Sequence, residues 1–103
     1  MMKQLSMVVQ ANVQQDLADR LRGIEHVQGF TFSHVEGHGR HTGDDRALSP
    51  RDKVVGYVPR VRVDILLDEA DISSVLEGLR CADCGITGNG VYWVVSVEQY
   101  GRL

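Results

Sequence analysis

Residues 29–43 have the sequence Gly29-Phe30-Thr31-Phe32-Ser33-His34-Val35-Glu36-Gly37-His38-Gly39-Arg40-His41-Thr42-Gly43. Apolar and polar side chains alternate over the first part of this stretch, which predicts a β-strand. Glycines follow at positions 37, 39 and 43, and glycine lets the backbone approach a ligand closely or adopt a positive φ. Arg40 stands among them, and its guanidinium fits a phosphate or a carboxylate. The stretch therefore predicts a strand that leads either into an anion-binding loop or into a flexible hairpin loop.

The same kind of pattern predicts five further elements around this strand. Alternation predicts strands near residues 5–9, 61–65 and 91–97, and apolar residues at three- or four-residue spacing predict two helices. Asn12, followed by Gln15, predicts a capping box at the first helix, and Asp68 or Glu69 starts the second. The two apolar helix stripes consist of Val13, Leu17, Leu21 and Ile24, and of Ile72, Val75, Leu76 and Leu79.

The element order is therefore βαββαβ. Right-handed crossovers fold such a chain into an α+β, ferredoxin-like domain, an antiparallel four-stranded sheet with both helices on one face. The uncovered face would carry a mixture of polar and apolar side chains, among them Val8, Thr31, Val35 and Leu66. Burying this face between identical subunits is the simplest remedy, so we expect a homo-oligomer.

Size and composition exclude several classes of protein. A chain of 103 residues with a net charge of −3 predicts one domain, 1–103, and gives no indication of nucleic-acid binding. Two cysteines make no secreted disulfide framework, and neither a signal peptide nor a membrane span is visible. We therefore expect a cytoplasmic protein.

Two stretches of the chain resemble the PII family of trimeric signal-transduction proteins. Residues 29–43 are similar to the family's second strand and its G-x-G-R entry into the long T-loop, here about residues 38–56. Residues 87–92, Thr87-Gly88-Asn89-Gly90-Val91-Tyr92, are similar to the B-loop, here about residues 84–91. The resemblance covers nearly the whole chain and implies a PII-like homotrimer.

The resemblance also implies adenine-nucleotide sites in clefts between subunits. The T-loop base and the B-loop would line the phosphates, Thr31 and Asp64 would contact the adenosine, Arg60 takes the place of a family lysine, and Arg102 corresponds to a C-terminal arginine. The implied nucleotide-binding residues are Thr31, Gly37, His38, Gly39, Arg40, Arg60, Asp64, Gly85, Gly88, Asn89, Gly90 and Arg102. A small anion such as bicarbonate would bind near Arg40, His41 and Arg60.

Departures from the family pattern indicate which adenine nucleotide the chain prefers. Val91 replaces the B-loop lysine, and a second C-terminal arginine has no counterpart, so ADP or AMP is favoured over ATP. His41 replaces the glutamine that helps to hold 2-oxoglutarate, and Lys53 stands in place of the T-loop tyrosine. The resemblance thus implies a regulator rather than an enzyme, with no catalytic cofactor. It would signal through its T-loop to a partner protein, for example a membrane transporter in inorganic-carbon uptake.

The pair Cys81 and Cys84 leaves a second function open. These cysteines follow the second helix, where the negative end of the helix dipole opposes thiolate formation. Ordinary reduced thiols, a reversible disulfide, and a metal site completed by His38 and His41 all fit the spacing. The alternative function is therefore a metal-linked adaptor or sensor for a heavy-metal efflux system.

Overall fold

The computed structural model describes residues 1–38, 58–80 and 90–103. Residues 39–57 and 81–89, which hold most of the expected T-loop and B-loop, lie outside this part. The elements run in the order β1 (Met2–Gln10), a 3₁₀ turn (Ala11–Val13), α1 (Gln14–Arg22), β2 (Thr31–Gly37), β3 (Val58–Asp68), a second 3₁₀ turn (Glu69–Asp71), α3 (Ile72–Arg80) and β4 (Val91–Ser96).

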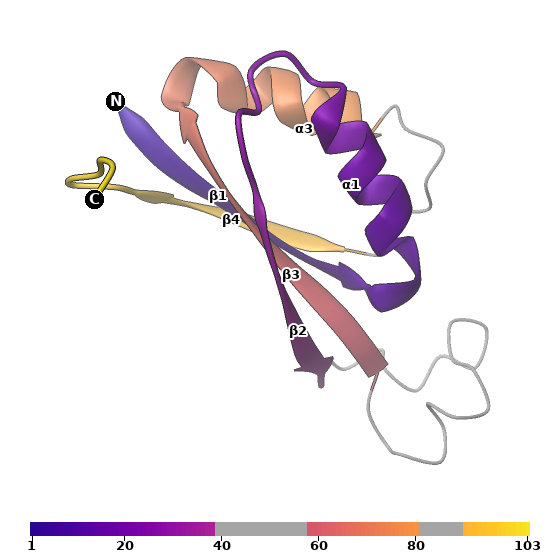
Figure 1. The fold of residues 1–103 in the computed structure, drawn as a ribbon. Coiled ribbons are helices and arrows are strands. Elements are labelled where there is room, and N and C mark those ends of the chain that lie inside the picture. The colour runs from indigo at the N-terminus through magenta and orange to yellow at the C-terminus, as the bar shows by residue number, and fades with distance from the viewer. Residues whose placement is uncertain (39–57, 81–89) are drawn as a thin grey trace.

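The four strands form one sheet in the order β2-β3-β1-β4, in which every neighbouring pair is antiparallel. Figure 1 shows α1 and α3 together on one side of this sheet, with the other side uncovered. The predicted ferredoxin-like α+β fold with both helices on one face is confirmed.

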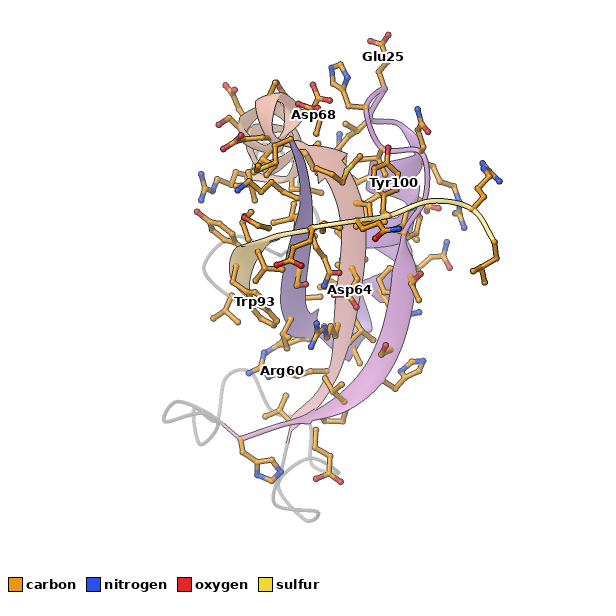
Figure 2. The ribbon with its side chains drawn as sticks, turned by 90° about the vertical axis from the view of Figure 1, so that its left-hand side faces the viewer. Glu25, Arg60, Asp64, Asp68, Trp93 and Tyr100 are labelled. Atoms are coloured by element: carbon orange, nitrogen blue, oxygen red, sulfur yellow. The ribbon has the colours of Figure 1, made fainter. Side chains whose placement is uncertain are left out.

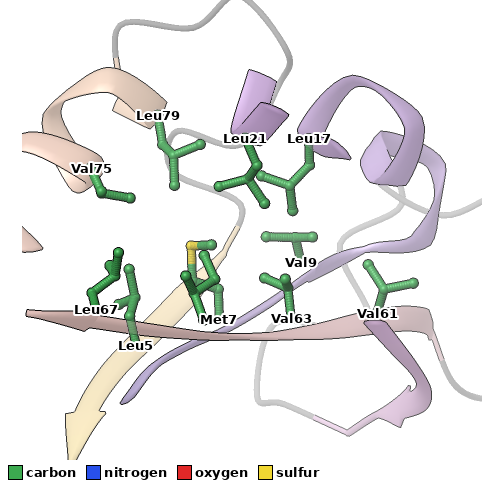
Figure 3. Packing of buried hydrophobic residues seen from close by; sticks show 11 residues of the cluster. Leu5, Met7, Val9, Leu17, Leu21, Val61, Val63, Leu67, Val75 and Leu79 are labelled. Atoms are coloured by element: carbon green, nitrogen blue, oxygen red, sulfur yellow. The ribbon is translucent and has the colours of Figure 1, made fainter. Parts of the chain in front are cut away.

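The hydrophobic core lies between the sheet and the two helices (Figure 3). Alternate residues of the two central strands point into it, because successive side chains of a strand face opposite sides. Both predicted helix stripes also contribute to this core. The buried members are Leu5, Met7, Val9, Leu17, Leu21, Val61, Val63, Ile65, Leu67, Val75 and Leu79.

The start of the first helix differs from the prediction. Asn12 lies inside the 3₁₀ turn, and neither this turn nor α1 has a side-chain cap hydrogen bond, so the predicted capping box is wrong. Ala11 and Val13 pack against the core, and this tertiary packing decides where the chain turns. The second helical segment begins as expected: Asp68 accepts a hydrogen bond from the backbone N–H of Ala70. That bond, helped by the nearby amino group of Met1, lowers the pKa of Asp68.

The sheet leaves apolar side chains exposed on its uncovered face and along β4. Leu66 of β3 is exposed, and so are all residues of β4, including Val91, Trp93 and Val95. Several exposed apolar side chains on one small domain are typical of an interface.

Gly90 places the beginning of β4 close against β1. A Cβ atom at position 90 would lie 2.8 Å from Val9 Cγ1 and 3.2 Å from the Val8 carbonyl oxygen. We therefore expect Gly90→Ala to lower the free energy of unfolding by about 1–3 kcal/mol through overpacking. Urea denaturation at a fixed protein concentration measures this change.

Gly101→Ala is the matched control, because a Cβ atom at position 101 meets nothing within 4 Å. Both substitutions restrict the unfolded chain in the same way, so the difference between them isolates the clash with β1. Equal denaturation midpoints for the two variants would contradict the close packing of Gly90.

Candidate functional site on the uncovered sheet face

One row of side chains crosses the uncovered face of all four strands. Thr31 of β2 is paired with Asp64 of β3, Asp64 with Ser6 of β1, and Ser6 with Trp93 of β4. Figure 2 looks onto this face, with Trp93, Asp64 and Arg60 labelled on it. The row brings a carboxylate, two hydroxyls and an indole ring together in the middle of the sheet.

Asp64 is the centre of a hydrogen-bond network in this row. Its Oδ1 atom accepts from Ser6 Oγ at 2.6 Å, from Arg62 Nε at 3.0 Å and from Gln4 Nε2 at 3.3 Å. The Arg62 guanidinium also lies over the Trp93 ring, with its Cζ atom 5.1 Å from the ring centroid. The side chains around Asp64 are therefore held by several contacts, which reduces the cost of ordering them around a ligand.

A hollow of about 640 Å³ lies beside this network, between the sheet and the C-terminal segment. Thr31 and Asp64 line it from the sheet, and Tyr100 and Arg102 line it from the C-terminal segment. In Figure 2 this segment runs from β4 toward the side of β2, with Tyr100 on it. The volume lies within the range of small-molecule sites.

Most of the charged side chains in the wall of the hollow are acidic. Asp64, Asp68 and Asp71 all line it, whereas Arg102 is its only arginine or lysine among the described residues. His26 is also in the wall, with its Nδ1 atom 3.5 Å from Asp71 Oδ1. Such a surface disfavours several phosphates and favours groups that donate hydrogen bonds.

A cation lies farther along the same face, at Arg60. Asp64 and Arg60 are four residues apart on β3, which corresponds to roughly 13 Å along a strand. The Arg60 side chain runs across Gly37 at the end of β2: a Cβ atom at position 37 would lie 2.5 Å from Arg60 Cδ and closer still to Nε. No carboxylate in the described part of the chain is paired with Arg60. Because Gly37 has no side chain, the Arg60 guanidinium can lie against the end of β2, from which the chain continues toward residues 39–57.

The structure groups the predicted site residues at two ends of this face. Thr31, Asp64 and Arg102 meet at the hollow, and Gly37 and Arg60 meet at the other end of β3. Gly90 lies against Val8 and Val9, toward that second end. His38 Nε2 is 3.2 Å from Glu36 Oε2. The other predicted residues lie outside the described part of the chain: Gly39, Arg40, His41, Cys81, Cys84, Gly85, Gly88 and Asn89.

Several site residues were not predicted from the sequence, namely Gln4, Ser6, Arg62 and Tyr100. Strand alternation puts Arg62 beside Asp64 on the same face of β3, whereas Gln4 and Ser6 reach Asp64 only through the pairing of β1 with β3. No sequence signal gives the course of the C-terminal segment beside the hollow.

Within residues 1–38, 58–80 and 90–103, no group of three or more His, Cys, Asp or Glu side chains could hold a metal ion. The disulfide and metal alternatives at Cys81 and Cys84 stay predictions. The helices of the described part are also too short or too polar to span a lipid bilayer.

Comparison with known families places the chain. The model of a family described as a protein of unknown function (DUF3240) matches residues 2–103. The chain belongs to the DUF3240 family. A crystal structure of a DUF3240 family protein from Shewanella baltica OS155, at 2.40 Å resolution, superposes with a TM-score of 0.76 at 22% identity. The match covers 99% of this chain and 96% of that one, which confirms the fold.

This DUF3240 protein is also similar to nitrogen regulatory proteins. The nitrogen regulatory protein P-II of Rhizobium leguminosarum bv. viciae is 31% identical over 78 residues, which are 75% of this chain and 70% of the relative. The nitrogen regulatory protein GlnK of Escherichia coli K12 is 23% identical over 103 residues, which are 99% of this chain and 91% of that protein. The predicted resemblance to the PII family is confirmed, and this DUF3240 protein is a divergent PII-like protein.

Proposed function

We propose that this protein is a non-enzymatic regulator that binds an adenine nucleotide, ADP or AMP in preference to ATP, on the uncovered face of its sheet. The observation that carries the proposal is the arrangement along β3. A hollow that includes the hydrogen-bonding groups of Thr31 and Asp64 lies toward the Asp68 end of β3, and the Arg60 cation lies roughly 13 Å from Asp64 toward the other end. A nucleotide has the same polarity, with donors on its nucleoside and negative charge on its phosphates.

Electrostatics orients the ligand on this face. The acidic wall of the hollow repels phosphate, so the nucleoside occupies the hollow and the phosphates extend toward Arg60 and Gly37. Val91, which is exposed beside this end, supplies no charge. Because a charge-assisted contact contributes about 1.5–3 kcal/mol, the third phosphate of ATP lacks the contacts that would stabilise it.

The site is completed by a second subunit. In a single chain the hollow is already present on the uncovered face, but Leu66, Trp93 and Val95 of that face are exposed to solvent. A homotrimer that covers these side chains also encloses the nucleotide, and Arg102 then contacts ligand at a subunit boundary. Bicarbonate is the proposed second ligand, at Arg60 with Arg40 and His41.

Signalling follows from where the phosphates lie. Gly37 and Val58, the last residue of β2 and the first of β3, flank residues 38–57. A phosphate bound beside Arg60 and Gly37 therefore touches the base of this segment and favours one of its conformations. A partner protein, for example a transporter for inorganic carbon, recognises that conformation.

Calorimetry of the purified protein against AMP, ADP, ATP, bicarbonate, 2-oxoglutarate and Zn²⁺ tests the proposal. We expect AMP and ADP to bind more tightly than ATP, and light scattering of the same sample to return three times the mass of one chain. Binding of Zn²⁺ with no binding of any nucleotide would contradict the proposal and favour the metal-linked adaptor. A monomer mass would remove the subunit boundary from the site.

A further inference from the structure

Ser6 is a fully buried hydroxyl on a sheet face that is otherwise open. Its exposed fraction is 0%, and it is the one buried polar or charged side chain of the described residues. A buried hydroxyl is tolerated only when it is hydrogen-bonded. Its Oγ atom donates to Asp64 Oδ1 at 2.6 Å, the length of a charge-assisted bond, and accepts from Gln4 Nε2 at 3.1 Å.

All donors to Asp64 in the described part of the chain meet the same oxygen atom. Ser6, Gln4 and Arg62 each donate to Oδ1, which fills the lone pairs of that atom. Nothing within residues 1–38, 58–80 and 90–103 donates to Oδ2. Thr31, the strand neighbour of Asp64 in the wall of the hollow, likewise has no side-chain hydrogen bond within these ranges.

We propose that Ser6 and Gln4 are positioning residues for ligand recognition, which hold Oδ1 of Asp64 so that Oδ2 accepts a hydrogen bond from the nucleoside. This inference rests on the proposed function, because it assigns the nucleoside to the hollow that Asp64 lines. An ionised carboxylate is only an acceptor, so it selects a ligand group that carries O–H or N–H. Adenosine offers two such groups, the exocyclic amine of the base and the ribose hydroxyls.

The bonds from Ser6 and Gln4 to Asp64, called the clamp below, keep the carboxylate in one orientation. A carboxylate that rotates freely in water pays an entropic cost when a ligand fixes it, whereas one held beforehand does not. Ser6 contributes the shortest bond, from β1, and Arg62 approaches from the same strand as Asp64 while stacked on Trp93. Removing Ser6 Oγ takes away the shortest bond to Asp64 and one of the two acceptors of Gln4, so the carboxylate is held less firmly by the longer bonds from Gln4 and Arg62.

The test measures binding of AMP, IMP and 2′,3′-dideoxy-AMP to the wild-type chain and to Ser6→Ala by calorimetry. We expect Ser6→Ala to weaken AMP binding by about 5- to 30-fold. The loss disappears for IMP if Oδ2 accepts from the base amine, and for dideoxy-AMP if it accepts from the ribose, because the analogue lacks the donor that Asp64 would meet. A purely structural role for Ser6 would weaken all three ligands equally, and that result would overturn the inference.

Ser74→Ala is the matched control, because Ser74 is an exposed serine of α3, in the helix layer on the opposite side of the sheet from Asp64. We expect it to leave all three affinities unchanged. Gln4→Ala repeats the test on a partly exposed residue if Ser6→Ala does not fold. A wild-type chain that binds none of the three ligands would refute the proposed function itself, whereas wild-type binding with unchanged affinities in both Ser6→Ala and Gln4→Ala would refute only the clamp.

Discussion

Replacing Leu21 by alanine is expected to lower the free energy of unfolding by about 2–5 kcal/mol. Leu21 is fully buried in the layer between α1 and the sheet (Figure 3), so the truncation leaves a cavity. The loss has two parts. One is the favourable free energy of moving the removed methyl groups out of water, and the other is the van der Waals contacts that the residues around the cavity lose. Small domains are stable by only about 5–15 kcal/mol, so this single change removes a large share of the total.

Arg20→Ala is the control for this prediction, because Arg20 is the preceding residue of α1 and is exposed. Alanine is a good helix former, so we expect a change within about 0.5 kcal/mol. Urea denaturation of both variants must use one protein concentration, since the apparent stability of an oligomer depends on it. If the two variants unfolded at the same midpoint, α1 would not pack on the sheet through Leu21.

The faces of the elements could be predicted from the sequence because they depend on local periodicity. Val61, Val63 and Ile65 alternate with charged neighbours, and the structure buries all three. The spacing of Leu17 and Leu21 likewise predicted the buried face of α1. The prediction that Asn12 caps the first helix was wrong. The preference of asparagine for a cap position is weak, and the packing of Ala11 and Val13 against the core overrides it.

Alternation alone could predict the candidate site only where one strand carries it, whereas Thr31 and Arg102 were implied by the family resemblance. Arg60 and Asp64 share β3, so alternation alone puts them on one face. The bond between Ser6 and Asp64 joins positions 58 residues apart, and it depends on the register of β1 against β3. Register follows from burial of the whole sheet, which a single strand does not reveal. The proximity of Tyr100 and Arg102 to Thr31 depends on the path of the C-terminal segment after β4, which strand alternation does not reveal either.

The second large effect is expected at Arg60, the cation at the phosphate end of the proposed site. We expect Arg60→Ala to weaken nucleotide binding by about 1.5–3 kcal/mol, or roughly 10- to 150-fold. The loss should be larger for ADP than for AMP, because a second phosphate brings more charge toward the guanidinium. Calorimetry with both nucleotides measures it, and Arg20→Ala, an arginine in the helix layer, should bind as the wild type does.

Gly37 supplies the decisive comparison for Arg60. A Cβ atom at position 37 would occupy the space of the Arg60 side chain, so Gly37→Ala should also weaken binding by displacing the guanidinium. In the Arg60→Ala background that clash is gone, and Gly37→Ala should then cost nothing further. This double-mutant cycle separates an effect through Arg60 from any other effect at the strand end. Additive losses in the double variant would mean that Gly37 acts on the ligand independently, and unchanged affinities in Arg60→Ala would mean that the phosphates do not lie at this end of β3.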